Sequence, residues 1–207
     1  MQFLDLKNHF RKSVVLSVSD IRKMEPSFDV RRLVEWQGKK YIKKIVRNFY
    51  VFSDQEITEP ALYIIANTIY QPSYISFEMA LSHYQLIPES VYGITSATSK
   101  KTTIFKTPLG DFIYHSLKPE LFFGYTLIPF QNQRYLIAEP EKALLDFFYM
   151  NPTLVNDNDF SGLRINQDEF LAKINREKLG KYLAIFDSPG LKKKVSRFIK
   201  FINHVDI

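Results

Sequence analysis

The positive charge of the chain is concentrated in its first quarter. Residues 1–52 carry 12 Lys and Arg against 5 Asp and Glu, a net charge of +7, whereas residues 53–207 carry 16 against 17, a net charge of −1. A basic region of this kind attracts polyanions such as nucleic acid. The same break divides the chain into a short basic part and a longer, nearly neutral part. We therefore predict two domains, at 1–53 and 60–207, with the acidic, proline-ended segment between them as a linker.

The composition excludes several classes of protein. Packed cores are expected, because 45% of the residues are hydrophobic and 15% are aromatic. The chain has no Cys, which rules out disulfides, thiolate nucleophiles and cysteine metal sites. The N-terminal residues lack the apolar core of a signal peptide, and no apolar stretch approaches the roughly 20 residues of a transmembrane helix. We expect a cytoplasmic protein without a membrane span.

The basic part is predicted to hold three short helices and a hairpin. Apolar spacing indicates a helix from Gln2 to Arg11, and Ser17 with Asp20 resembles a capping box that opens a second helix. Strand-prone residues follow a third helix at 41–45 and 49–52, with a tight turn at 46–48. This order of elements is typical of a winged helix-turn-helix.

The third helix is the expected DNA-reading element. Asp29 is the predicted cap and Gly38 the predicted end. At about 100° per residue, one face of this helix is apolar and would be buried; it comprises Val30, Leu33 and Val34. The opposite face, which would meet solvent and DNA, comprises Arg31, Arg32 and Glu35.

Two kinds of DNA contact are expected from these cations. Arg31 and Arg32 would reach base edges in the major groove, because Arg paired with guanine is the commonest specific contact. The lysines and Arg47 would contact phosphates without reading sequence. The predicted DNA-contacting residues are Ser27, Arg31, Arg32, Lys39, Lys40, Lys43, Lys44 and Arg47. The competing interpretation is an ordinary solvated charged surface.

The second part is predicted to be an α+β domain with a mostly antiparallel sheet flanked by helices, so the whole chain belongs to the α+β class. Helices are expected at 61–70, 77–85, 140–149, 167–186 and 191–203. Strands are expected at 74–76, 92–95, 102–107, 112–115, 125–128 and 135–138. The segment 108–111 is predicted to be a hairpin turn, and 151–166 a loop.

No active site is predicted in this part. The four histidines fall in four different elements, and no metal-binding pattern is present. Capping of a helix N-terminus explains Glu139 and Glu141, and Lys142 with Asp146 is a plain i,i+4 pair. The basic residues of the last helix, at 192–194, 197 and 200, are read as a solvated face. We therefore expect no enzyme activity, no metal and no cofactor.

Two segments of the second part carry a family resemblance. They are Y-I-S-F-E-M-A-L at 74–81 and I-A-E-P-E-K-A-L-L-D at 137–146. Together with the predicted winged helix, they resemble the AbiEi-type antitoxins, the regulators of bacterial abortive-infection (type IV) toxin-antitoxin pairs. The likeness covers about the first three quarters of the chain. The family often has Gly where Asn48 stands here, and Asn is the next best residue for a left-handed turn.

The resemblance implies a transcriptional autorepressor that binds double-stranded operator DNA and acts as an antitoxin in phage defence. It also implies a nucleotidyltransferase-like partner toxin, against which protection needs no stable complex. An inverted-repeat operator would hold two copies of the chain, which is compatible with a homodimer on DNA. Two alternatives remain open. They are an orphan regulator without a toxin and a winged-helix module that binds protein.

Overall fold

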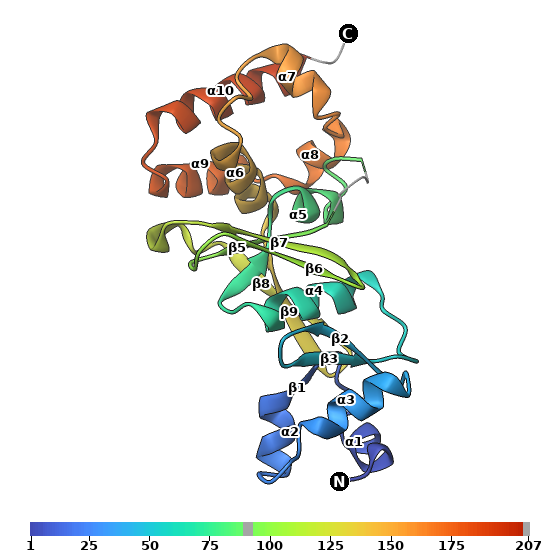
Figure 1. Cartoon of the computed structure of the whole chain (residues 1–207). Coiled ribbons are helices and arrows are strands. Elements are labelled where there is room, and N and C mark those ends of the chain that lie inside the picture. The colour runs from blue at the N-terminus through green and yellow to red at the C-terminus, as the bar shows by residue number, and fades with distance from the viewer. Residues whose placement is uncertain (89–92, 205–207) are drawn as a thin grey trace.

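The computed structural model describes residues 1–88 and 93–204, and it belongs to the α+β class. Figure 1 shows an elongated molecule. Three N-terminal helices lie at one end, and the helices of the C-terminal third lie at the other. Between them lie a small three-stranded sheet, helix α4 and a six-stranded sheet.

The basic part forms the predicted helices and strands. Its elements are α1 (Phe3–His9), β1 (Leu16–Ser17), α2 (Val18–Met24), α3 (Arg31–Gly38), β2 (Ile42–Val46) and β3 (Phe49–Phe52). The three strands are antiparallel in the order β1-β3-β2. Ser17 caps α2 as predicted, because its hydroxyl accepts from the Asp20 backbone N–H at 3.0 Å. The reciprocal bond of a capping box is replaced, since the Asp20 carboxylate accepts from the Ser17 hydroxyl at 2.6 Å.

The start of α3 and the β2–β3 turn agree with the prediction better than the end of α3 does. The Asp29 carboxylate accepts from the Arg31 backbone N–H at 3.0 Å, as expected, although Val30 is the N-cap residue. Helix α3 ends at Gly38, but the left-handed residue that follows is Lys40, with φ of 57°. Asn48 takes a φ of 70° in the β2–β3 turn, so it occupies the left-handed position expected of it.

The predicted orientation of α3 is wrong in one respect. Leu33 is buried, but the second buried residue is Trp36, and Val30 and Val34 are exposed. The Trp36 ring packs against Phe3 and Phe28, with ring centroids 5.6 and 5.9 Å apart. The packing of this indole between the two aromatic rings decides which face of the helix points inward.

The small sheet packs on both faces. Ile42, Tyr50 and Phe52 join the core beneath the three helices. Ile45 and Val51 join the larger core of the second part instead. The two parts of the chain therefore share apolar packing across this sheet, in addition to the irregular connection between β3 and α4.

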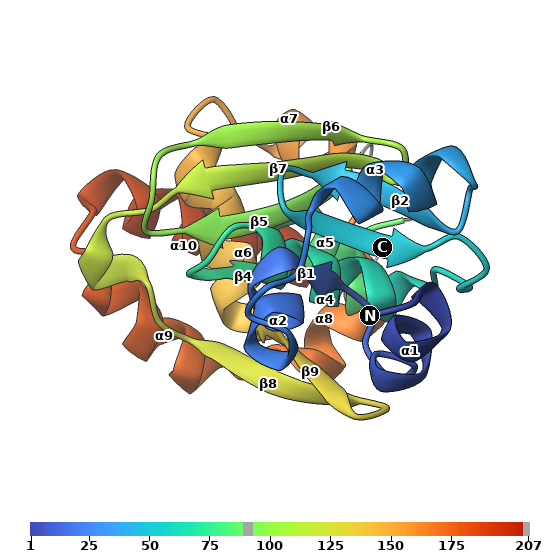
Figure 2. The ribbon, with the colours of Figure 1, turned by 60° about the horizontal axis from the view of Figure 1, so that its bottom comes forward.

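The six-stranded sheet is mixed. Its strands are β4 (Ser73–Ile75), β5 (Ile94–Thr98), β6 (Thr103–Thr107), β7 (Gly110–Ser116), β8 (Tyr125–Phe130) and β9 (Gln133–Ala138). The order is β6-β7-β5-β4-β9-β8, in which β4–β9 and β5–β7 are parallel and the other three pairs are antiparallel. Figure 2 shows β6, β7 and β5 side by side, with the β8–β9 hairpin at the opposite edge. The first residue of the predicted strand 92–95, Tyr92, lies outside the described residues.

Helices cover both faces of this sheet. Helix α4 (Glu59–Ile69) lies on the side of the small sheet, whereas α5 (Phe77–His83) and α6 (Pro140–Met150) lie on the other. A 3-10 turn, η1 (Pro119–Leu121), connects β7 to β8. Helix α6 starts at Pro140 as predicted, since proline suits the first turn of a helix.

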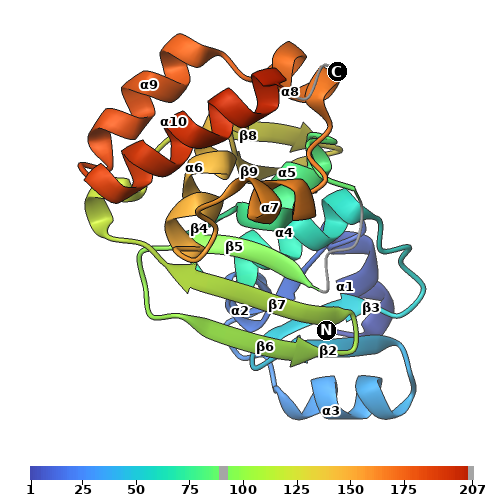
Figure 3. The same ribbon diagram turned by 90° about the horizontal axis from the view of Figure 1, so that it is seen from above.

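Four helices form the C-terminal part of the chain that the structure describes, and the last two of them pack over α6, as Figure 3 shows. They are α7 (Asp157–Gly162), α8 (Gln167–Lys173), α9 (Arg176–Ile185) and α10 (Pro189–His204). Helix α7 lies within the segment predicted to be a loop. Asn156 and Asp159 form a capping box that starts it. The predicted helix 167–186 is two helices, because Asn175 caps α9 through the backbone N–H of Lys178.

Candidate nucleic-acid interface

A concave surface lies between α2, α3 and the β2–β3 hairpin. It encloses about 890 Å³ and is open to solvent. Its charged lining residues are Arg22, Lys23, Lys44 and Arg47. Its apolar lining comprises Val18, Val30, Leu33, Val34, Phe49 and Tyr50. Four cations and an apolar floor from three separate elements thus converge on one surface, which we call the basic groove.

Three of the four cations of the basic groove are available to a ligand. Arg22, Lys44 and Arg47 are exposed, and within residues 1–88 and 93–204 none of them has an ion pair or a side-chain hydrogen bond. Lys23 differs, because its ammonium lies 2.7 Å from the Asp20 carboxylate. Unpaired surface cations attract phosphate without first breaking a contact, so these three residues dominate the potential of the groove.

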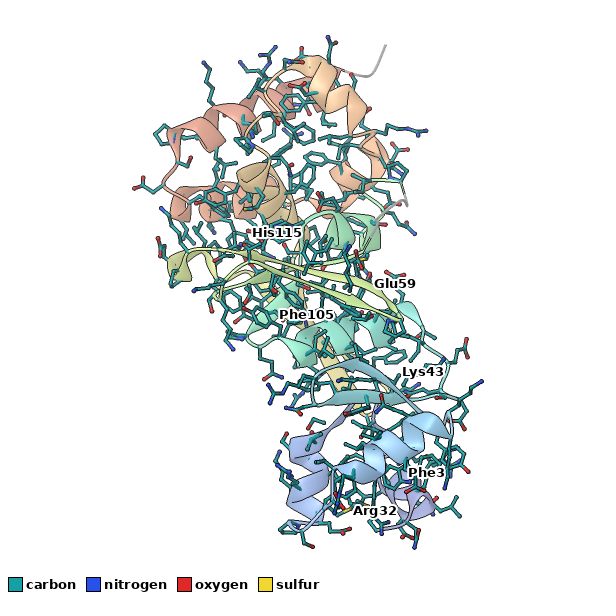
Figure 4. The ribbon with its side chains drawn as sticks, viewed as in Figure 1. Phe3, Arg32, Lys43, Glu59, Phe105 and His115 are labelled. Carbon is teal, nitrogen blue, oxygen red and sulfur yellow. The ribbon has the colours of Figure 1, made fainter. Side chains whose placement is uncertain are left out.

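The two arginines predicted to read bases are both engaged within the protein. The Arg31 guanidinium lies 2.8 Å from the Asp29 carboxylate and remains 89% exposed. The hydrogen bond from Arg31 holds the pKa of the Asp29 carboxyl below its usual value. Arg32 is half-buried and donates to the backbone carbonyl of Met1. Figure 4 places Arg32 among the N-terminal helices, so its predicted outward orientation is wrong.

The predicted phosphate-contacting residues separate into two groups. Lys44 and Arg47 line the basic groove, but Lys43 does not. Lys43 pairs in register with Val51, on the sheet face turned toward the second part of the chain, and Figure 4 shows it there. The Lys39 ammonium is paired with the Glu35 carboxylate at 2.6 Å.

The remaining two candidates lie on connecting segments. Lys40 is exposed after α3, and Ser27 is exposed in the turn between α2 and α3. Neither lines the basic groove. Sequence reasoning missed Arg22, Val30 and Val34. Arg22 directly follows the buried Ile21 on α2, which was a signal that it faces outward, whereas nothing in the sequence contradicted burial of the valines.

The two segments that carry the family resemblance meet inside the second part. Asp146 accepts from the Tyr74 hydroxyl at 3.0 Å and from the Ser76 hydroxyl at 2.8 Å. Lys142 donates to the Tyr74 oxygen at 2.9 Å and also to Asp146. All four side chains are buried. We call this set the Tyr-Ser-Lys-Asp network.

Burial governs the ionisation of this network. Desolvation raises the pKa of Asp146 and lowers that of Lys142, while the attraction between the two charges opposes both shifts. The Lys142 ammonium also lies 5.0 Å from the ring centroids of Phe123 and Phe186. Both charged side chains have no exposed surface. Lys142 and Asp146, predicted to form an ordinary i,i+4 pair, are therefore part of a buried structural network.

The acidic residues at the start of α6 do not act as side-chain caps. Glu139 binds the Lys178 ammonium at 2.8 Å and accepts from the Tyr182 hydroxyl. Glu141 accepts from the backbone N–H of Asn175 at 2.8 Å. These contacts tie α6 to α9, which corrects the predicted capping role. Among the described residues, no three acidic or histidine side chains gather as metal ligands would.

The last helix is less solvated than predicted. Lys194 is buried, and its ammonium donates to the backbone carbonyls of Phe148 and Asn151 at the C-terminal end of α6. Arg197 lies 2.9 Å from Asp157 on α7. Only Lys192 and Lys193 remain as exposed cations without a partner on the described part of this helix.

No protein-family model matches the chain, and no curated protein matches it either. Within the described residues, none of the helices combines the length and the apolar character that a bilayer crossing needs.

Proposed function

We propose that the protein is a DNA-binding transcriptional regulator in which residues 1–53 act as a winged helix-turn-helix. The proposal rests on one observation, the convergence of the unpaired cations Arg22, Lys44 and Arg47 on the basic groove beside α3. The element order supports it, because three helices with a β1-β3-β2 sheet are the parts that such a domain requires. In this arrangement α3 enters the major groove while α2 and the hairpin hold phosphates.

We further propose that the regulator is an autorepressor and the antitoxin of a type IV, AbiE-like pair. The Tyr-Ser-Lys-Asp network supports this, since the two segments of the resemblance, Tyr74 and Ser76 in one and Lys142 and Asp146 in the other, act as one structural unit. The partner toxin would be nucleotidyltransferase-like, and protection would not need a stable complex.

DNA binding is tested with the purified full chain, its own upstream DNA and a scrambled duplex, across a salt series. The variant replaces Arg22, Lys44 and Arg47 with Gln. The matched control replaces three exposed cations of the second part, Lys118, Lys192 and Lys193, with Gln, so that both proteins lose the same charge.

The proposed regulator predicts tight binding to the upstream DNA that the groove variant loses and the control keeps. Losing three phosphate contacts would also reduce the salt dependence, by about 2.7 in the slope of log K against log salt. An equal loss of binding in both variants would show that the basic groove contributes only net positive charge. Equal binding of the wild type to both duplexes would contradict the proposed regulator. Rescue of cells that express the adjacent toxin gene tests the antitoxin activity separately.

A further inference from the structure

The outward face of α3 in the basic groove is apolar. Val34 is 69% exposed and Val30 is 41% exposed, and both line the groove one helical turn apart. Scattered apolar residues on a surface need no explanation, but this pair lies on the floor of a surface that carries three unpaired cations. The cations select a polyanion as the occupant, and the valines then face whatever that polyanion presents between its phosphates.

The polar side chains of α3 are already occupied. Arg31 is paired with Asp29, Arg32 donates to the Met1 carbonyl, and Glu35 is paired with Lys39. Gln37 donates its amide to the backbone carbonyl of Leu33. The helix therefore offers base edges two apolar side chains in place of the arginine contacts expected from the sequence.

Thymine matches this surface. In the major groove, thymine is the base that presents an apolar group, its 5-methyl, and apolar side chains recognise it by direct contact. Excluding water from one methyl-sized group strengthens binding by about 4-fold. We propose that Val30 and Val34 read the 5-methyl groups of two thymines in the DNA held by the basic groove. This inference rests on the proposed DNA binding and specifies the sequence class that α3 selects.

Deoxyuridine isolates the methyl group, because it keeps every hydrogen-bonding atom of thymidine. The full chain is titrated against its upstream duplex made with thymine and against the same duplex made with uracil. We expect the wild type to prefer the thymine duplex by about 16-fold if two methyl groups are contacted, and by about 4-fold if one is. The Val30→Ala/Val34→Ala variant should bind the two duplexes equally.

Two control proteins complete the design. Val155→Ala shortens a valine that is 52% exposed in the second part, in the same way as each of the two groove substitutions, and it should keep the wild-type preference. Arg47→Gln should weaken binding to both duplexes while leaving their ratio unchanged. Circular dichroism checks that each variant is folded. We expect all of them to fold, because the substituted positions are exposed.

Each contrary outcome has one meaning. Tight, sequence-dependent binding with no preference for thymine would overturn the methyl contact and leave the regulator in place. If the double alanine variant keeps the preference for thymine, the preference comes from DNA shape, and the proposed valine–methyl contact is wrong. Absence of binding to every duplex would remove both the regulator and the contact. Dimerisation through the valines without DNA would likewise overturn the proposal.

Discussion

Lys142 and Asp146 form an ion pair in which neither side chain has any exposed surface. Tyr74 and Ser76 complete the set of hydrogen bonds around the carboxylate. Taking both charges out of water is costly, and only a complete set of partners offsets that cost. The network therefore makes the junction of β4 and α6 sensitive to the loss of any one member.

The first prediction concerns the loss of one charge. Lys142→Met should lower the free energy of unfolding by about 3–5 kcal/mol, because Asp146 would remain buried without its ammonium. Adding Asp146→Asn should recover part of that loss, since no unpaired charge then remains. Urea unfolding of the two single variants and the double variant measures the coupling. Strictly additive losses would show that the two side chains act independently.

The second prediction compares neighbouring lysines of α10. Lys194→Met should destabilise the protein by about 1–3 kcal/mol, because one buried and one partly buried carbonyl at the end of α6 would lose their donor. Lys193→Met, at an exposed position, should stay within about 0.5 kcal/mol of the wild type. Thermal or urea unfolding checks both. Equal effects at the two positions would contradict the capping role of Lys194.

Local signals predicted many of the elements. The cap at Ser17, the left-handed turn at Asn48 and the proline start of α6 each depend on the chemistry of a few adjacent residues. The same reasoning should have found α7, since Asn156 and Asp159 have the spacing of a cap, but the polar composition of 151–166 favoured a loop.

Contacts between distant residues could not be predicted. The rotation of α3 depends on the fit of Trp36 against Phe3 and Phe28, which the spacing of its valines does not reveal. Tyr74 and Asp146 are 72 residues apart, and the parallel pairing of β4 with β9 and the packing of α5 on α6 bring them together. The set of candidate DNA-contacting residues changed for the same reason, because the hydrogen bond from Arg32 to the Met1 carbonyl is a tertiary contact.

The third prediction concerns pH. Desolvation lowers the pKa of His83 and of His115 below the ordinary value of 6.5. At His83, Glu59 opposes this shift and Lys173 adds to it. At His115, Glu78 opposes the shift. The unfolded chain therefore takes up protons first as the pH falls through about 6.5, and the folded state loses stability from that point downward.

The measurement is urea unfolding at a series of pH values from 8 to 5. Replacing the half-buried His115 with Gln should reduce the fall in unfolding free energy by up to about 1.4 kcal/mol per pH unit. Replacing His83 with Gln should have a smaller effect, because His83 is exposed and solvent screens its charge. Above pH 7.5 neither histidine titrates, so each variant should run parallel to the wild type there. An unchanged slope below pH 6.5 in both variants would show that neither side chain destabilises the protein on protonation.

The fourth prediction concerns the Asp29–Arg31 pair beside the basic groove. Asp29→Asn keeps an oxygen that can accept from the Arg31 backbone N–H, but removes the charge that holds the guanidinium. A released Arg31 on the outer side of α3 could contact a phosphate. Binding of the upstream DNA should then strengthen at low salt, and the slope of log K against log salt should become more negative by about 0.9. Asp157→Asn is the matched control, since Asp157 pairs with Arg197 at 2.9 Å on the exposed surface of the second part. If both substitutions steepen the salt dependence equally, the change reflects net charge alone, and Arg31 stays off the DNA.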